Sequence, residues 1–209
     1  MDACRDRWLD LMRRLTAASA PAVDAAFSLV DAAYRVPLRA YHDLSHVSAC
    51  LALLDDARGA FEFPAIAEYA IWLHDAIYDP ARPDNEQRSA AAARILGIGL
   101  GIAEAALDAV ETMILATRHA GPAETRDAAL VADIDLAILA AAADGYQAYA
   151  RAIRAEYAVY DDAEFAAGRT RFLKAMLERE RIYQTSLFHG RFEAAARRNL
   201  ADEIAERAT

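Results

Sequence analysis

The stretch AIAEYAIWLHDAI, residues 65–77, decides the fold. Its alanine, isoleucine and leucine residues favour a helix, and no strand-like alternation of polar and apolar residues interrupts them. Gly59 and Pro64 mark a turn before this stretch, and Asp79-Pro80 opens a loop after it. The pattern therefore predicts an apolar helix over residues 65–77 that carries His74 and Asp75 near its carboxyl end.

The rest of the chain also follows a helical pattern. Helices are expected over residues 45–58 and 103–117, Asp84 is expected to cap the amino end of another, and three glycines in residues 95–101 predict a break between helices. No alternating pattern longer than a few residues predicts a strand. With helices of about 11 residues, we expect one all-α domain over residues 1–209, built as a helical bundle of roughly eight to ten helices.

Composition narrows the classes of function. The 209 residues include 56% hydrophobic residues, which is enough for a sizeable core, and the net charge is −9. Lys174 is the only lysine and basic residues do not cluster, so long nucleic acid is not an expected partner. No apolar run is long enough to predict a membrane span. Cys4 and Cys50 cannot form a disulfide framework, and a cytoplasmic location is expected.

Histidines and acids occur at three places that matter for chemistry. YHDLSH at residues 41–46 holds two histidines four residues apart, which on a helix would share one face. They could bind a metal, pair a ligand with an acid-base residue, or simply be polar residues at a helix start. His74-Asp75 adjoins a buried run, where Asp75 needs a partner such as a cation, or else lies at an exposed helix end. Histidine nitrogen and carboxylate oxygen together suit divalent metals.

The third place is Asp133-Ile134-Asp135, which apolar residues surround. On a helix, side chains two residues apart diverge by about 200°. We therefore expect one of these acids to point inward and the other to cap a helix or face solvent. The pattern alone does not choose between Asp133 and Asp135.

Taken together in order and spacing, these motifs resemble the HD superfamily of metal-dependent phosphohydrolases. The similarity is greater to a small bacterial subfamily of predicted HD phosphohydrolases and covers about residues 40–200. The stretches that carry it are residues 41–46, 72–80, 84–86, 117–119, 133–136, 182–183 and 196–200. The resemblance implies an HD-type domain with a metal-binding core at about residues 40–140, completed by C-terminal helices at 145–206.

The resemblance also implies a ligand set. The metal ligands would be His46, His74, Asp75 and Asp135, and Asp135 is preferred because the last ligand looks like the second acid of Asp-x-Asp-Leu. Related cyclic-nucleotide phosphodiesterases have Tyr-His-Asn, whose histidine is an acid, so His42 is either an acid or a ligand, although this chain has Asp43 in place of the asparagine. Two imidazoles and two carboxylates would balance one divalent ion per chain, whether Mn, Fe, Zn, Ni, Co or Mg.

Further residues near these motifs have two interpretations each. His119 could contact a phosphate or orient water, or it could end a helix. Asp79 and Glu86 could activate water, or they could be a turn residue and a first-turn acid. Phosphate-binding residues across the pocket would be Arg154, Tyr157 and Arg169, although arginine on an amphipathic helix is usually solvated.

The expected function is hydrolysis of a small phosphate ester, with a nucleotide as the preferred substrate, by attack of water bound to the metal. His42 or His119 would assist proton transfer. The chain would be a monomer or a homodimer. Two alternatives stay open: a dinuclear-iron HD oxygenase, against which the single histidine between His74 and Asp135 argues, and a nucleotide-binding regulatory protein without turnover.

Overall fold

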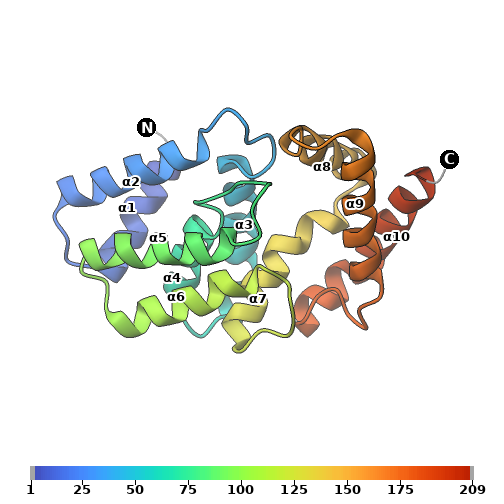
Figure 1. The fold of residues 1–209 in the computed structure, drawn as a ribbon. Coiled ribbons are helices and arrows are strands. Elements are labelled where there is room, and N and C mark those ends of the chain that lie inside the picture. Colours follow the sequence, from blue (N-terminus) through green and yellow to red (C-terminus); the bar gives the residue numbers. More distant parts are fainter. Residues whose placement is uncertain (1–2, 208–209) are drawn as a thin grey trace. The chain divides into compact units, whose positions relative to one another are not determined.

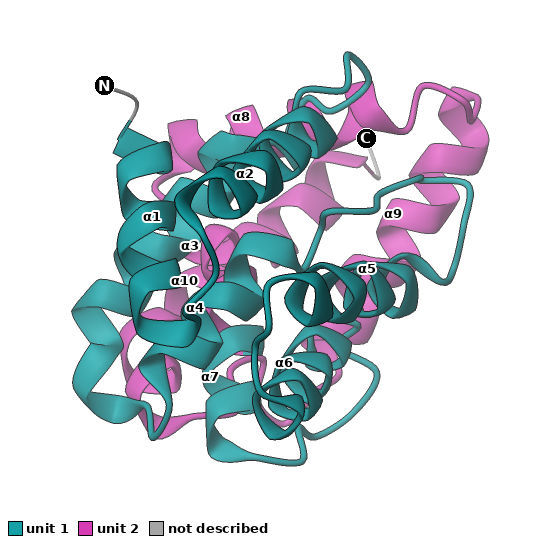
Figure 2. Ribbon diagram, turned by 90° about the vertical axis from the view of Figure 1, so that its left-hand side faces the viewer, with its two compact units in different colours: residues 1–132 teal, residues 133–209 magenta. Residues whose placement is uncertain are grey.

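The computed structural model describes residues 3–207, and every regular element in that range is a helix. Ten α-helices and two short 3-10 helices follow one another (Figure 1), which confirms the all-α class and the expected eight to ten helices. The chain divides into two compact units, residues 1–132 and 133–209 (Figure 2). The expectation of one domain over residues 1–209 stays a prediction.

The described part of unit 1 contains six complete α-helices, one 3-10 helix and the start of a seventh α-helix. Their bounds are α1 Ala3–Leu15, α2 Ala20–Tyr34, α3 Leu44–Ala57, the 3-10 helix η1 Arg58–Ala60, α4 Pro64–Leu73, α5 Asn85–Gly99 and α6 Glu104–Ala116. Helix α7, Arg126–Asp135, begins in unit 1 and its last three residues belong to unit 2.

Helix α4 is the centre of unit 1. It packs against α1, α3, α5 and α6, and all its residues from Ala67 to Leu73 are buried. Trp72 of α4 meets Trp8 of α1 edge to face, with the ring centroids 5.8 Å apart, and Tyr69 lies 5.9 Å from the same indole. The apolar run therefore forms a helix that is covered on every side, as its composition predicts.

The one acid inside that run, Glu68, is only 1% exposed and has three arginine partners. Arg7, Arg14 and Arg58 contact its carboxylate at 2.8, 2.9 and 3.0 Å. Burial alone would raise the pKa of Glu68, but the hydrogen bonds from Arg58 and Arg14 outweigh it and lower the pKa. A buried ion-pair network thus ties α1, η1 and α4 together.

One predicted boundary is wrong. The helix expected over residues 65–77 ends at Leu73, so His74 is its C-cap and Asp75 follows it. The break expected within residues 95–101 is confirmed at the end of that range, because α5 runs through Gly97 to Gly99 and the chain then turns at Leu100 and at Gly101, whose φ is 72°. A Cβ atom at Gly97 would lie 2.3 Å from Leu107 Cδ2, so this glycine allows α5 and α6 to approach closely instead of ending a helix.

Unit 2 holds the end of α7 and four further elements. These are the 3-10 helix η2 Leu136–Ala140, α8 Ala143–Glu156, α9 Asp162–Leu177 and α10 Ser186–Arg207. Helix α10 packs against η2 and α9. Glu193 of α10 accepts backbone hydrogen bonds from Ile182 and Tyr183, and Asn199 donates to the carbonyls of Leu139 and Ala141. These side chains satisfy backbone groups that lie outside the α-helices.

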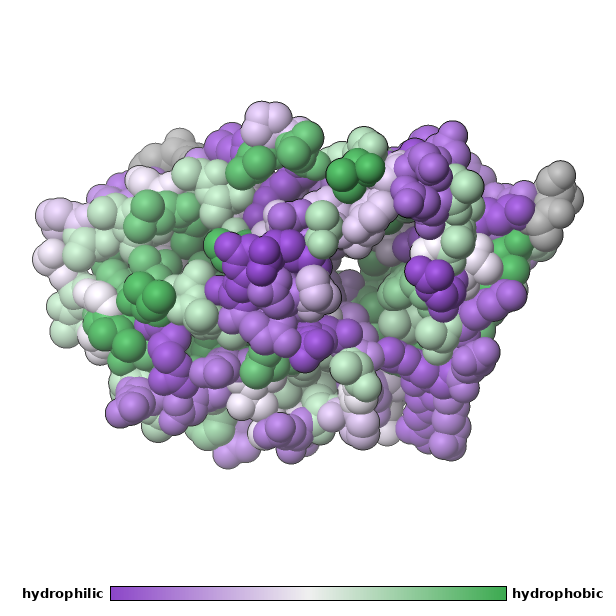
Figure 3. Space-filling view, in the orientation of Figure 1, coloured by the Kyte–Doolittle hydropathy of each residue, from purple (hydrophilic) through white to green (hydrophobic). Residues whose placement is uncertain are grey.

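The surface of unit 1 is mixed in polarity. Ile95 and Ile98 of α5 are 72% and 63% exposed, and Figure 3 shows hydrophobic atoms over this helix. Hydrophilic atoms gather over the amino end of α5 and the preceding loop, where Arg82 pairs with Asp84. Asp84 does occupy the N-cap position, but its side chain makes that ion pair instead of the predicted cap. Among the described helices, none has the length and apolarity needed to cross a membrane.

Candidate metal centre

His46 lies in the first turn of α3, and Asp43 holds that turn. The Asp43 carboxylate caps the helix by accepting hydrogen bonds from the backbone N–H groups of Ser45 and His46, at 2.7 and 3.4 Å. Aspartate and asparagine cap helices about equally well. Asp43 therefore fixes the first turn of α3, from which His46 projects.

His74 lies at the end of α4 with a defined ring orientation. Its Nδ1 is 2.8 Å from the carbonyl oxygen of Ile71, and a carbonyl can only accept a hydrogen bond. Nδ1 therefore carries a proton and donates it, and Nε2 is the ring nitrogen that faces the other candidate ligands. A backbone carbonyl bound to the second ring nitrogen is the usual arrangement behind a metal-ligating histidine.

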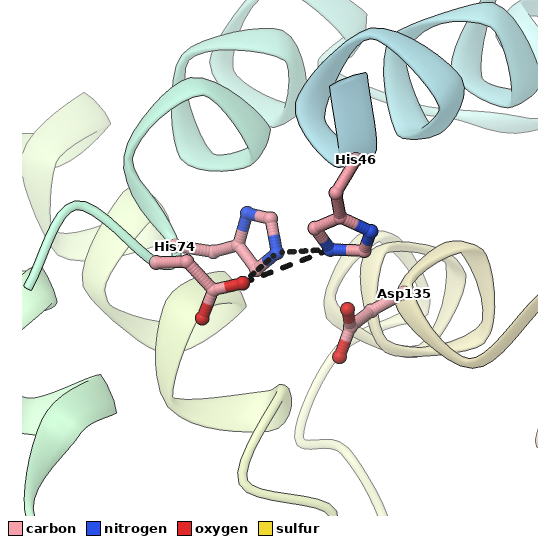
Figure 4. Close-up of side chains that lie close together, drawn as sticks. His46, His74 and Asp135 are labelled. Atoms are coloured by element: carbon pink, nitrogen blue, oxygen red, sulfur yellow. Dashed lines mark hydrogen bonds and ion pairs between the residues drawn. The ribbon is translucent and has the colours of Figure 1, made fainter. Parts of the chain in front are cut away.

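Three ligand atoms in unit 1 form a small triangle. Nε2 of His46 lies 3.1 Å from Nε2 of His74, and Oδ2 of Asp75 lies 3.0 Å from His74 Nε2 and 3.6 Å from His46 Nε2. Figure 4 shows the two rings with their nitrogens turned toward each other. An ion bound at about 2.1 Å holds neighbouring ligand atoms about 3.0 Å apart in an octahedral shell and about 3.4 Å apart in a tetrahedral one. The triangle therefore fits a divalent ion.

The contact between His74 and Asp75 indicates a positive charge on or between these groups. A neutral His74 ring and the Asp75 carboxylate would be two acceptors only 3.0 Å apart, so either a proton on Nε2 or a cation joins them. The two histidines are 4% and 2% exposed, so water screens this contact little. Burial, and then the charge of Asp75, raise the pKa of the neighbouring Tyr34 phenol well above its usual value. A cation at the triangle would relieve this concentration of acceptors.

Asp135, also labelled in Figure 4, is the last residue of α7 and belongs to unit 2. Its neighbour Asp133 is 1% exposed and fully engaged within unit 2. The Asp133 carboxylate accepts hydrogen bonds from the backbone N–H groups of Gln184 and Thr185, both at 2.7 Å, and from the Thr185 hydroxyl at 2.6 Å. Asp133 is thus the inward, structural acid of the pair, and the assignment of Asp135 as a ligand stays a prediction.

His42 lies beside the triangle but not on α3. It belongs to the turn before the helix, so the expectation that His42 and His46 share one helix face is wrong. The two rings are nevertheless 5.8 Å apart. The His42 ring stacks on Tyr78, with centroids 4.1 Å apart, and meets Tyr41 edge to face at 4.9 Å. Aromatic contacts therefore hold this imidazole close to the candidate ligands.

Arg39 is the residue at this site that the sequence analysis did not identify. Its guanidinium donates hydrogen bonds to the backbone carbonyls of His42, Asp75 and Ala76. A signal was present in the sequence, since Arg39 stands three residues before His42. However, an arginine that binds carbonyls far along the chain leaves no periodic pattern, and only tertiary structure reveals it.

The other candidates near the metal motif have local contacts. Oδ1 of Asp79 accepts from the backbone N–H of Ala81, and its backbone bonds the Asn85 side chain, as expected for a turn residue. Glu86 lies in the first turn of α5. His119 follows α6 with φ of 53°, after Thr117 has capped the helix. The contacts of Asp79 favour its structural interpretation, and catalytic roles for these three residues stay predictions.

The predicted phosphate-binding residues lie in unit 2, where two of them have structural contacts. Arg154 pairs with Asp162 at 2.7 Å and donates to the carbonyls of Tyr157 and Tyr160. Arg169 is buried, and its guanidinium is bound by Glu203 and the Tyr149 hydroxyl. Tyr157 is the C-cap residue of α8. These contacts account for both arginines without a substrate, so phosphate binding by this group gains no support.

No known protein family, no curated protein and no solved structure matches this chain. The resemblance to the HD superfamily therefore stays a prediction that depends on the motifs. What the described residues show is a buried group of histidine and aspartate side chains in unit 1 that could hold a metal ion.

Proposed function

We propose that this chain is a metal-dependent phosphohydrolase of the HD type that acts on a small phosphate ester, with a nucleotide as the expected substrate. The observation that carries the proposal is the triangle of His46, His74 and Asp75, in which three possible ligand atoms lie 3.0–3.6 Å apart and the Ile71 carbonyl orients the His74 ring. A protonated histidine would explain a single contact, whereas one bound cation accounts for all three distances together.

We propose Asp135 as the fourth ligand. Two neutral imidazoles and two carboxylates would balance the charge of one divalent ion per chain. Four ligands leave two positions of an octahedral shell for water and a substrate oxygen. When bound, such an ion would polarise the phosphoryl group and lower the pKa of water. The engagement of Asp133 with residues 184–185 supports the choice of Asp135.

The residues around the triangle supply the remaining chemistry of the proposal. His42 is the proton donor to the leaving oxygen, because an imidazole exchanges protons near neutral pH and this ring lies 5.8 Å from that of His46. His46 and His74 are buried, which removes water that would otherwise weaken the attraction between the site and a phosphate ester.

The metal assignment is tested by elemental analysis of protein purified without chelator. We expect about one transition-metal ion per wild-type chain and almost none in His74→Ala and Asp75→Asn. The matched control is His189→Ala, which removes a histidine that pairs with Glu193 in unit 2 and should keep the metal. Full occupancy in either triangle variant, with a folded protein, would refute the ligand assignment.

The reaction is tested by a screen of phosphate monoesters and diesters, nucleotides included, on the metal-loaded protein. We expect hydrolysis that is lost in His74→Ala and reduced by about 10²–10⁴-fold in His42→Ala, the usual contribution of a general acid. Binding of a nucleotide without any turnover would instead identify a regulatory protein. Two irons per chain together with dioxygen consumption would identify an oxygenase.

A further inference from the structure

Arg39 joins two turns of unit 1 that are distant in sequence. One of its terminal nitrogens donates to the carbonyl of His42 at 2.8 Å and to that of Asp75 at 2.6 Å. The other donates to the carbonyl of Ala76 at 3.0 Å. The His42 turn precedes α3 and the Asp75 turn follows α4, so neither segment has a helical hydrogen-bond ladder of its own.

Two aromatic rings flank the same guanidinium. Its central carbon lies 4.9 Å from the ring centroid of Tyr34 and 5.7 Å from that of Tyr78. Tyr78 is also the ring on which His42 stacks. Arg39 therefore contacts the His42 turn twice, directly through the carbonyl and indirectly through Tyr78. It contacts the Asp75 turn through two consecutive carbonyls.

From these contacts we infer that Arg39 is a positioning residue, which fixes the distance between the proposed proton donor, His42, and the proposed ligand, Asp75. This inference rests on the proposed function, because only a metal site gives that distance a purpose. The planar guanidinium is required, since it directs several N–H groups in fixed directions and lies along aromatic rings. A lysine would keep the charge, but it would lose both the simultaneous carbonyl contacts and the planar contact with the rings.

The positive charge of Arg39 allows a positioning role to be distinguished from a purely electrostatic effect on metal binding. A positive group near a cation site repels the metal, so an effect of charge alone would make Arg39→Ala bind metal more tightly and leave Arg39→Lys unchanged. If Arg39 acts by positioning, both variants should bind metal more weakly, because neither would hold the two turns together. Loss of outer contacts of this kind weakens metal binding by about 10–100-fold.

The experiment is a titration of metal-free protein with Co²⁺, followed by visible absorption, on the wild type, Arg39→Ala, Arg39→Lys and the control Arg13→Ala. Arg13 is an exposed arginine that pairs with Asp10 on α1. We expect both Arg39 variants to bind Co²⁺ about 10–100-fold more weakly than the wild type. The control Arg13→Ala should bind it with wild-type affinity. Methylguanidinium, but not methylammonium, should restore binding to Arg39→Ala, because the three carbonyls and two rings form a site for a planar cation.

Wild-type affinity in Arg39→Lys, or equal rescue by the two cations, would overturn the inference. A second measurement, on metal-free protein that a thermal unfolding transition shows to be folded, separates this inference from the proposed function. The ring protons of His42 should resonate upfield in the wild type because of the stacked Tyr78, and this shift should disappear in Arg39→Lys. If the wild type binds no Co²⁺, the proposed function fails. If the His42 shift persists in the lysine variant, the positioning role fails.

Discussion

At the scale of single residues, the candidate site depends on which hydrogen bonds each polar side chain has already made. His74 uses Nδ1 on the Ile71 carbonyl, which leaves Nε2 for another partner. Asp133 uses both of its oxygens to accept hydrogen bonds from residues 184 and 185. Two aspartates that look equivalent in the sequence therefore have different chemistry, because one satisfies the backbone around the start of α10.

The two aspartates should respond differently to the same substitution. In Asp133→Asn the amide nitrogen would face a backbone N–H, so the variant should lose about 2–3 kcal/mol of unfolding free energy, the cost of leaving a buried donor without an acceptor. Asp135→Asn should change the unfolding free energy of metal-free protein by less than about 1 kcal/mol but should weaken metal binding strongly. Urea unfolding and Co²⁺ titration measure the two effects, and the reverse pattern would contradict the assignment.

At the scale of elements, the candidate ligands of unit 1 are placed at helix ends. His46 lies in the first turn of α3, and His74 and Asp75 follow the last turn of α4. Helix ends present side chains next to backbone groups that lack intrahelical partners, so a cap can orient a neighbouring ligand. For α3 that cap is Asp43, which bonds the N–H of His46 itself.

We expect Asp43→Ala to lower the unfolding free energy by about 1 kcal/mol, the usual value of an N-cap, and also to weaken metal binding. Asp43→Asn should retain both properties, because asparagine caps equally well and the cap needs no negative charge. Thermal unfolding and metal titration of the two variants give the comparison. A loss of metal affinity in Asp43→Asn equal to that in Asp43→Ala would show that Asp43 acts by its charge and not as a cap.

At the scale of the whole molecule, each unit contains a buried acid held by arginine. Glu68 in unit 1 has three arginine partners, and Glu203 in unit 2 accepts from Arg169 and Tyr146. Burial would raise the pKa of Glu203, but hydrogen bonding and the charge of Arg169 outweigh it, so its pKa is lowered, as it is for Glu68. Removing Arg169 from its buried pair with Glu203 would leave that charge poorly compensated, at a cost of about 3–5 kcal/mol, whereas Glu68 would keep two arginines after the loss of one.

The lowered pKa values of Glu68 and Glu203 predict a loss of folding stability at acid pH. Because the pKa values of Glu68 and Glu203 in the folded protein lie below the ordinary glutamate value of 4.5, the unfolded chain binds protons first as the pH falls. Their contribution to stability is complete above about pH 5 and disappears as the pH falls through the lowered values. Urea unfolding between pH 7 and pH 3 should show this loss, and Glu68→Gln should be destabilised at pH 7 and show a shallower decline. An equal decline in the variant would contradict the role of Glu68.

The sequence by itself determined the all-α class, the apolar helix α4 and most helix positions, because these follow from propensity, apolar spacing and proline. It also identified the two histidines and Asp75 as candidates. Tertiary structure alone decided where α4 ends, that α5 continues through Gly97, and that Arg39 joins two turns. The physical reason is the distance in sequence over which each contact acts. Periodicity reflects the pattern within one helix. The glycine at the contact of α5 with α6, and the arginine that binds carbonyls distant in the sequence, make their contacts only after the chain has packed.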